Sequence, residues 1–159
     1  MHTLPDGPKI AMNPPVTALL DRKAAGVRTV ASSITVAAAV AEMNRHGIGC
    51  VVVLDGERLA GVFTERDVLR RVVGGGLDPD RTLVAQVMTA NPVTIAPETT
   101  VEEAMEIMTE KRCRHLPVID ANGHVRGLIS IGDATRWTVD SHRAEVEHLK
   151  SYISGGYQA

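Results

Sequence analysis

The sequence predicts a mixed α/β (α+β) fold built from two copies of a strand–helix–strand–strand–helix unit, with one further helix at the C-terminus. Three observations support this prediction. The chain of 159 residues is 44% hydrophobic and 23% charged, a globular composition with enough apolar material for a core. Its two halves repeat each other in register. Within each half, apolar segments of strand length alternate with segments whose apolar residues recur at helical spacing.

The internal repeat extends over most of the chain. Residues 29–36 (TVASSITV) match residues 94–101 (TIAPETTV), which lie 65 positions further on. The second copy then gains one residue in a turn, and the match resumes at a spacing of 66. Because chance rarely keeps such a register through strands and turns alike, the chain contains two copies of one unit. Further matched pairs are Met43 and Met108, Val53 and Val118, Gly61 and Gly127, and Asp67 and Asp133.

Each copy predicts the same elements in the same order. A short strand leads to a first helix, for which Ser33 or Thr99 provides the N-cap. Two apolar strands follow, joined by a turn rich in Gly, Asp and Asn, and a second helix begins directly after them, near Thr64 or Ser130. The two strands are predicted at 50–54 and 59–63 in the first copy, and at 116–119 and 125–129 in the second.

The C-terminal segment predicts an amphipathic helix. Val146, Leu149 and Ile153 recur at helical spacing, so their apolar stripe must cover either the chain's own domain or a second copy. The three glycines at 74–76 lack the Lys-Ser or Lys-Thr of a phosphate loop, which favours a plain turn. We therefore divide the chain into an N-terminal extension (1–15), a first repeat (16–76), a linker (77–84), a second repeat (85–140) and a C-terminal helix and tail (141–159).

Composition excludes several classes of function. Lys and Arg number 17 against 19 Asp and Glu, so the charge does not favour binding to a nucleic-acid duplex. Aromatic residues are 3% of the chain, too few for a base-stacking platform. Two cysteines cannot form a disulfide framework, which indicates a reducing compartment. Without a signal peptide at 1–13 or a membrane-length apolar run, we expect a cytoplasmic protein that does not enter a membrane.

The strand-to-helix junctions are the first candidate site. In each copy a hydroxyl residue begins a helix and a carboxylate follows three positions later, as Thr64 with Asp67 and Ser130 with Asp133. One interpretation is a capping box, in which both side chains bond backbone N–H groups. The other is a nucleotide site, because a helix N-terminus favours phosphate and a carboxylate accepts hydrogen bonds from a ribose diol.

A basic cluster precedes one strand of the second copy. Arg112, Arg114 and His115 lie where a helix runs into this strand, and a guanidinium binds phosphate bidentately. The alternative is a solvated basic helix end that compensates the helix dipole, especially for Arg112. The first copy has His46-Gly47-Ile48-Gly49-Cys50 in this place, so the two sites differ chemically.

These motifs together resemble the CBS domain pair, or Bateman module. The resemblance covers about residues 16–140 and rests on the two hydroxyl-x-x-Asp motifs after Gly and two apolar residues, on Leu116-Pro117-Val118-Ile119-Asp120, and on Val87-Met88-Thr89. It implies two β-α-β-β-α units related by a pseudo-twofold axis, with two clefts between them and a homodimer. It also implies a non-catalytic module that binds adenosine compounds.

The resemblance assigns residues of both copies to each cleft. In the first cleft Asp67 would hold ribose, while Thr64, Arg114 and His115 would hold phosphate. In the second cleft Lys23 or Arg28 would serve as the phosphate partner. The first cleft ranks above the second, which lacks an Arg-His pair. The first would contain Val62, Thr64, Arg66, Asp67, Val93, Thr94, Cys113, Arg114 and His115. The second would contain Lys23, Arg28, Thr29, Ile48, Gly49, Cys50, Leu128, Ser130 and Asp133.

The functional hypotheses differ in ligand and output. The first is a sensor of AMP, ADP or ATP that passes ligand occupancy to a separate protein partner. The second is a redox sensor that binds NAD(H), and the third is a dimeric scaffold with vestigial clefts. An enzyme is disfavoured because Cys113 and His115, two apart on a strand, do not form a dyad. A metal site is disfavoured because the histidines and cysteines are scattered along the chain.

Overall fold

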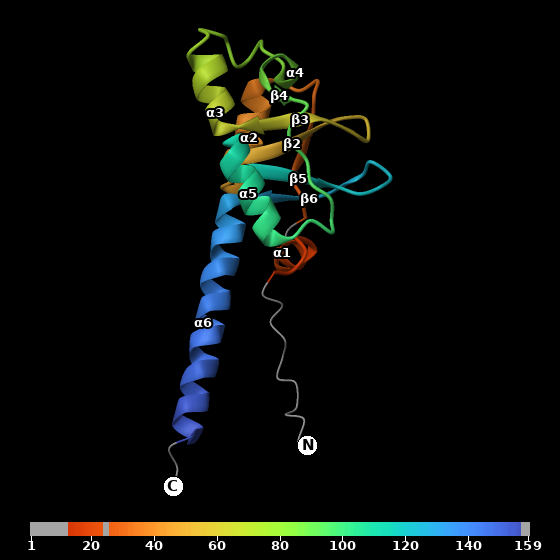
Figure 1. Ribbon diagram of the computed structural model, residues 1–159. Coiled ribbons are helices and arrows are strands. Elements are labelled where there is room, and N and C mark those ends of the chain that lie inside the picture. The colour runs from red at the N-terminus through yellow and green to blue at the C-terminus, as the bar shows by residue number, and fades with distance from the viewer. Residues whose placement is uncertain (1–12, 24–25, 157–159) are drawn as a thin grey trace.

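The computed structural model describes residues 13–23 and 26–156, and these form two similar α/β units with one long helix leaving them (Figure 1). This confirms the predicted fold class. The first unit contains β1 (Thr29–Ala31), α2 (Val36–His46), β2 (Cys50–Asp55), β3 (Arg58–Thr64), and α3 (Glu65–Asp67), which continues as a π-helical segment over Val68–Val73. The second contains α5 (Val101–Lys111), β5 (His115–Ile119), β6 (Val125–Ser130) and α6 (Ile131–Gly156). The short elements outside this order are α1 (Thr17–Arg22), α4 (Val84–Val87) and β4 (Thr89–Ala90).

The sheets follow the repeat. The first has the order β1-β2-β3-β4, with β1 parallel to β2 and the other pairs antiparallel. The second has β5 antiparallel to β6, and Ile95 forms one parallel bridge with Val118. That bridge is the counterpart of the pair Val30 and Val53 in the first sheet. The first strand of the second copy is thus reduced to a single bridge.

The predicted N-caps of α2 and α5 were wrong by two residues and one residue, respectively. Thr35 caps α2, its hydroxyl accepting a hydrogen bond from the N–H of Ala38 at 3.2 Å. Thr100 caps α5 in a capping box with Glu103. The hydroxyl of Thr99, the predicted cap, instead accepts the N–H of Ala96 at 3.1 Å in the preceding turn. The local sequence offered neighbouring hydroxyls, and this turn decides between them.

The short helices α1 and α4 are exchanged between the two copies. The core of the second copy, around Leu116 and Ile129, includes Val16 and Leu19 from the α1 region. The core of the first copy includes Val84 and Val87 of α4. Backbone bonds repeat the exchange, since the N–H of Val16 bonds the carbonyl of Thr99 and that of Val84 bonds the carbonyl of Ile34. Each folded unit is therefore made of two separate chain segments. The predicted boundaries 16–76 and 85–140 divide the sequence into repeats, and they do not coincide with the folded units.

The matched glycines Gly61 and Gly127 allow this exchange. A Cβ atom on Gly61 would overlap the carbonyl oxygen of Thr89 in β4. A Cβ on Gly127 would overlap the side chain of Leu20 in α1. β4 in the first copy and α1 in the second therefore pack directly on the backbone of the sheet. Glycine, which has no side chain, leaves room for this close approach.

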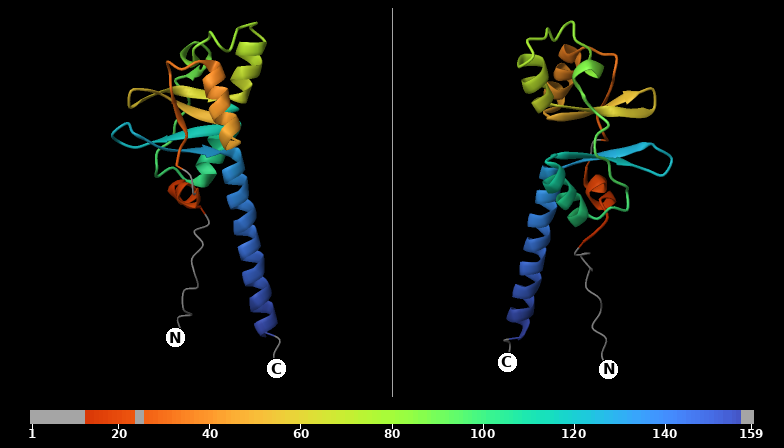
Figure 2. Two further views of the ribbon diagram at one scale, coloured as in Figure 1. Left: turned by 180° about the vertical axis from the view of Figure 1, so that it is seen from behind. Right: turned by 45° about the horizontal axis from the view of Figure 1, so that its top comes forward.

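The long helix α6 projects away from the body of the molecule, as both views of Figure 2 show. Its first turns are attached: Ala134 is buried, the Arg22 guanidinium lies 4.6 Å from the centre of the Trp137 ring, and Arg22 pairs with Asp140 at 3.2 Å. From Glu145 onward every described side chain is exposed. The helix thus begins in the core of the second copy and ends outside the body.

Candidate functional site

The first strand-to-helix junction is a capping box with a buried carboxylate. The Thr64 hydroxyl accepts the N–H of Asp67 at 3.2 Å, and the Asp67 carboxylate accepts the N–H of Thr64 at 3.0 Å. Asp67 is only 5% exposed. The capping interpretation is thereby confirmed for this copy, and it leaves open whether the same carboxylate also binds a ligand.

Two further side chains cover Asp67, Thr89 from β4 and Arg71 from the π-helical continuation of α3. The Thr89 hydroxyl, in β4, lies 3.1 Å from Oδ1 and 3.3 Å from Oδ2 of Asp67. The Arg71 Nε lies 3.8 Å from Oδ1, and its Nη1 also donates to the carbonyls of Val87 and Met88. Thr89 was not predicted as a site residue, although it follows the Val87-Met88 pair that carries part of the resemblance. The only signal for it was a hydroxyl residue at the end of that motif.

The second junction is also a capping box, but a cation covers it. The Asp133 carboxylate accepts the N–H of Ser130 at 2.9 Å, and the Ser130 hydroxyl accepts the N–H of Asp133 at 3.1 Å. The Lys23 ammonium lies 2.7 Å from Oδ2 of Asp133 and donates to the carbonyl of Leu128 at 2.7 Å. Burial raises the pKa of Asp133, but the bonds from Lys23 and Ser130 outweigh it and leave this pKa below its usual value.

Lys23 and Thr89 each lie at the C-terminal end of an exchanged helix. Lys23 is the C-cap of α1, and Thr89 directly follows the C-cap of α4. Each therefore reaches the carboxylate of the copy onto which its helix is exchanged. The sequence predicted Lys23 near the second cleft as a phosphate partner, and the structure brings its ammonium to the carboxylate predicted to hold ribose.

The strand starts border the junctions of their own copies. Cys50 pairs with Thr64 in the first sheet, and His115 pairs with Ser130 in the second. Helix and strand are joined by backbone bonds, from the N–H of Glu65 to the carbonyl of Gly49 at 3.0 Å and from the N–H of Ile131 to that of Arg114 at 2.8 Å.

Charges of both copies act at these strand starts. Burial lowers the pKa of His115 and the charge of Lys23 lowers it further, against the opposing charges of Asp133 and, from the first copy, Glu65. Burial raises the pKa of the Cys50 thiol to about 12, Asp67 adds to the rise, and Lys23, bound to the second copy, opposes it. The two junctions are therefore near enough to influence each other electrostatically.

The remaining predicted residues differ in accessibility. Arg66 and Arg114 are exposed, and neither pairs with a carboxylate within residues 13–23 and 26–156. Their guanidinium groups are thus available to an anion. Arg112, the left-handed C-cap of α5, is exposed as well. Among the other predicted residues, Arg28, Thr29, Val93 and Thr94 are exposed, Ile48, Gly49, Cys113, Leu128 and Ser130 are half-buried, and Val62 and Cys50 are buried.

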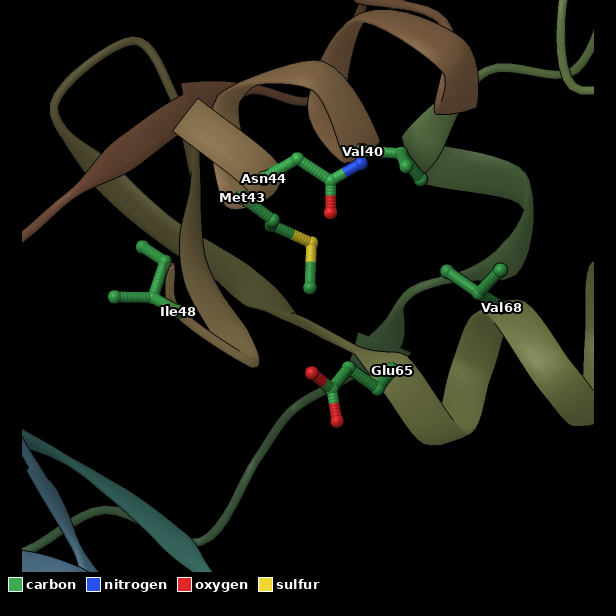
Figure 3. Close-up of a pocket in the computed structure, with 6 residues that line it drawn as sticks. All are labelled: Val40, Met43, Asn44, Ile48, Glu65 and Val68. Carbon is green, nitrogen blue, oxygen red and sulfur yellow. The ribbon is translucent and has the colours of Figure 1, made fainter. Parts of the chain in front are cut away.

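One pocket lies on the helical side of the first copy (Figure 3). It has a volume of about 140 Å³, below the roughly 300–1,000 Å³ of typical ligand pockets. Of the predicted site residues, Ile48 alone lines it, and Glu65 places it beside the first junction. The sequence did not predict this pocket, which is too small for a nucleotide. Its lining residues are Val40, Met43, Asn44, Ile48, Glu65 and Val68.

The thiols do not provide an activated nucleophile. Burial raises the pKa of Cys113 as it does that of Cys50, so both thiols are protonated at neutral pH. The part of the chain that the structure describes holds no group of three His, Cys, Asp or Glu side chains arranged for a metal ion. In the same part, no helix has both the length and the apolar character needed to cross a membrane.

Comparison with known proteins identifies the family. The CBS domain model matches twice, over residues 10–74 and 84–140. The chain therefore belongs to the CBS-domain family, whose members are generally regulatory, and carries the domain as a pair. The resemblance stated from the sequence is confirmed.

Individual relatives agree with this assignment. The mitochondrial CBS domain-containing protein CBSX3 of Arabidopsis thaliana is 43% identical over 128 residues, which are 77% of this chain and 62% of that relative. A Burkholderia ambifaria protein with CBS domains, described as a candidate signal-transduction protein, has a TM-score of 0.75 and 38% identity, covering 79% of this chain and 94% of that one. The CBS domain protein PAE2072 of Pyrobaculum aerophilum, solved in complex with AMP, has a TM-score of 0.67 and 25% identity, covering 75% and 88%.

Proposed function

We propose that this CBS pair is a non-catalytic regulatory module that binds an adenine nucleotide between its two repeats and passes ligand occupancy to a protein partner. The observation that carries the proposal is the pair of strand-to-helix junctions, each with a hydroxyl-x-x-Asp box, together with Arg66 and Arg114, which are exposed and pair with no carboxylate of residues 13–23 and 26–156. The AMP complex of the Pyrobaculum aerophilum relative supports AMP, ADP or ATP as the ligand class.

In the first cleft, Asp67 would accept the ribose hydroxyls, while Thr64, Arg66, Arg114 and His115 would face phosphate. Guanidinium suits this role because it binds phosphate bidentately and stays charged. Burial lowers the pKa of His115, which favours the neutral imidazole in the ligand-free protein. The base would contact the less polar residues, which are Val62, Val93, Thr94 and Cys113.

In the second cleft, Asp133 would take the ribose role and Ser130 would face phosphate. Lys23 or Arg28 would supply the positive charge. Ile48, Gly49, Cys50 and Leu128 would line the base, and Thr29 would lie at the margin. The ranking of the first cleft above the second stays a prediction, and the burial of Asp67 weighs against it, because Asp67 is buried whereas Asp133 is half-buried.

Ligand binding at either junction would have to move a covering residue. A ribose reaches Asp67 only if Thr89 turns away, and it competes with Lys23 for Asp133. Since Lys23 and Thr89 each follow an exchanged helix, ligand occupancy would be felt at the packing of one copy on the segment from the other. This is a physical route from a bound nucleotide to the surface that a partner recognises.

A thermal-shift screen with AMP, ADP, ATP, NAD⁺, NADH and S-adenosylmethionine tests the proposal. A ligand at about a hundred times its dissociation constant adds roughly 2.7 kcal/mol of stability, which is readily detected. A selective nucleotide, confirmed by calorimetry, supports the sensor, and a preference for NAD⁺ or NADH supports the redox alternative. If no compound shifts the transition at millimolar concentration, the chain is a scaffold and the proposal fails.

Variants locate the phosphate. Arg114→Ala should weaken nucleotide binding much more than adenosine binding, because adenosine lacks the phosphate that the guanidinium would contact. Arg143→Ala, which removes an exposed arginine from α6, is the matched control. Equal losses for nucleotide and adenosine would remove Arg114 from the phosphate role. A cytoplasmic location, a homodimer and a protein partner stay predictions.

A further inference from the structure

The outer half of α6 carries an apolar stripe that the body of the molecule leaves uncovered. The helix continues well beyond both sheets (Figures 1 and 2), and Val146, Leu149 and Ile153 are 47%, 53% and 59% exposed. Val139, closer to the body, is 44% exposed. An apolar stripe of this kind on a projecting helix is a surface for association rather than part of the monomer's core.

The stripe has the spacing of a coiled coil. Val139, Val146 and Ile153 are seven residues apart, at position a of a heptad, and His142 and Leu149 are at position d. Every a position is β-branched, and one of the two d positions is leucine. In a parallel coiled coil, this combination favours two strands.

The body of the chain packs on a different face of the same helix. Ala134 and Trp137 belong to the core of the second copy, and the hydroxyl of Thr138 lies 3.8 Å from the sulfur of Met105. At 3.6 residues per turn, the stripe lies roughly 100° around the helix from these residues. A second helix can therefore lie along the stripe without displacing the body.

Charges beside the stripe distinguish the two possible orientations. Glu145 is at position g and Lys150 at position e of the next heptad. In a parallel pair, g of one helix faces e of the next heptad of its partner, so Glu145 would meet Lys150 of the other copy. Within the monomer these two side chains make only long, exposed contacts, Glu145 with His142 at 4.0 Å and Lys150 with Glu147 at 3.8 Å, so they are free to exchange partners.

We propose that residues 139–153 of α6 form a parallel, in-register, two-stranded coiled coil with the same segment of a second copy of this chain. The complementary g and e charges and the β-branched a positions select this occupant over an unrelated protein. A two-fold axis along the helices brings position a against a and d against d, as a self-complementary interface requires. The proposal does not depend on nucleotide binding, and its test contains no nucleotide.

Disulfide trapping tests the register. In a Cys113→Ser background, Leu149→Cys places one thiol at d in each copy, and mild oxidation should link most of the protein as a dimer of twice 17.0 kDa on a non-reducing gel. Glu147→Cys, at position b on the opposite side, is the control and should form at least tenfold less dimer. If the two variants cross-link equally, or neither does, the parallel seam is wrong.

Charge reversal tests the orientation. In sedimentation equilibrium, Glu145→Lys and Lys150→Glu should each weaken dimerisation several-fold, because each places like charges across the seam. The double variant Glu145→Lys/Lys150→Glu should recover most of the loss. Because these side chains are exposed, the fold should be unaffected, which circular dichroism checks. Dimerisation unchanged in both single variants, or no recovery in the double variant, overturns the proposal.

Discussion

Replacing Asp67 with alanine should destabilise the chain by about 2–4 kcal/mol, independently of any ligand. The carboxylate is 5% exposed and accepts the N–H of Thr64 at 3.0 Å and the hydroxyl of Thr89 at 3.1 Å. Alanine leaves the Thr64 N–H without its acceptor in a partly buried place, which costs about 1–3 kcal/mol. The bond from Thr89 adds about 0.5–1.5 kcal/mol, while both hydroxyls can turn to other acceptors.

Urea unfolding at pH 7 measures this loss as a free energy, and thermal unfolding measures it as a fall in Tm. For a chain of this size each kcal/mol lowers the Tm by roughly 2–4 °C, so Asp67→Ala should lower it by roughly 5–15 °C. Asp67→Asn keeps an oxygen that accepts the Thr64 N–H, so it should lose only about 1 kcal/mol of unfolding free energy. This smaller loss makes Asp67→Asn the better variant in which to test nucleotide binding. Thr89→Val isolates the bond from β4. An Asp67→Ala protein within about 0.5 kcal/mol of the parent would show that the capping box and its cover contribute nothing to stability.

Three further changes follow from the structure, each measured by the urea midpoint. Asp133 has a lowered pKa, so its ion pair with Lys23 stabilises the fold above the unfolded pKa of about 3.9 and is lost as pH falls through the folded pKa. Lys23→Met should reduce this acid sensitivity by about 1 kcal/mol or less, because the Lys23 side chain is 35% exposed and Ser130 still lowers the pKa of Asp133. Arg112→Gly should stabilise the fold by about 1 kcal/mol, because Arg112 has a φ of 54°, a left-handed conformation that glycine adopts without strain. An unchanged midpoint would show that the backbone at Arg112 is not strained. Gly61→Ala should cost about 1–3 kcal/mol and Gly127→Ala less, because a strand backbone opposes the first and a flexible leucine side chain the second; the reverse order would contradict this packing.

Local features of this chain were predictable because they depend on residues near in sequence. The strand-helix-strand-strand-helix order follows from apolar periodicity, and the capping boxes at Thr64 and Ser130 follow from a hydroxyl and a carboxylate three positions apart. The same reasoning failed at Ser33 and Thr99, where adjacent hydroxyls compete for one helix end. Local spacing gives the type of element and leaves its first residue uncertain by one or two positions.

The exchanged helices were beyond prediction because their contacts join distant parts of the chain. Val16 bonds Thr99, and nothing in the sequence around either residue specifies the other. The same long-range packing brings Thr89 onto Asp67 and Lys23 onto Asp133. The sequence therefore predicted the two capping boxes, Thr64 with Asp67 and Ser130 with Asp133, and it could not predict what covers each carboxylate.

That cover makes two locally similar junctions electrostatically different. Asp67 receives a neutral hydroxyl, with the nearest cation at 3.8 Å, whereas Asp133 receives an ammonium at 2.7 Å. Under the proposed function, a ribose at Asp133 would release the Lys23 ammonium next to the ligand, where it can pair with a phosphate. A neutral nucleoside would break the same ion pair but has no phosphate with which Lys23 could form a new one. The second cleft should thus discriminate nucleotides from nucleosides through Lys23, a property that its lack of an Arg-His pair alone would not suggest.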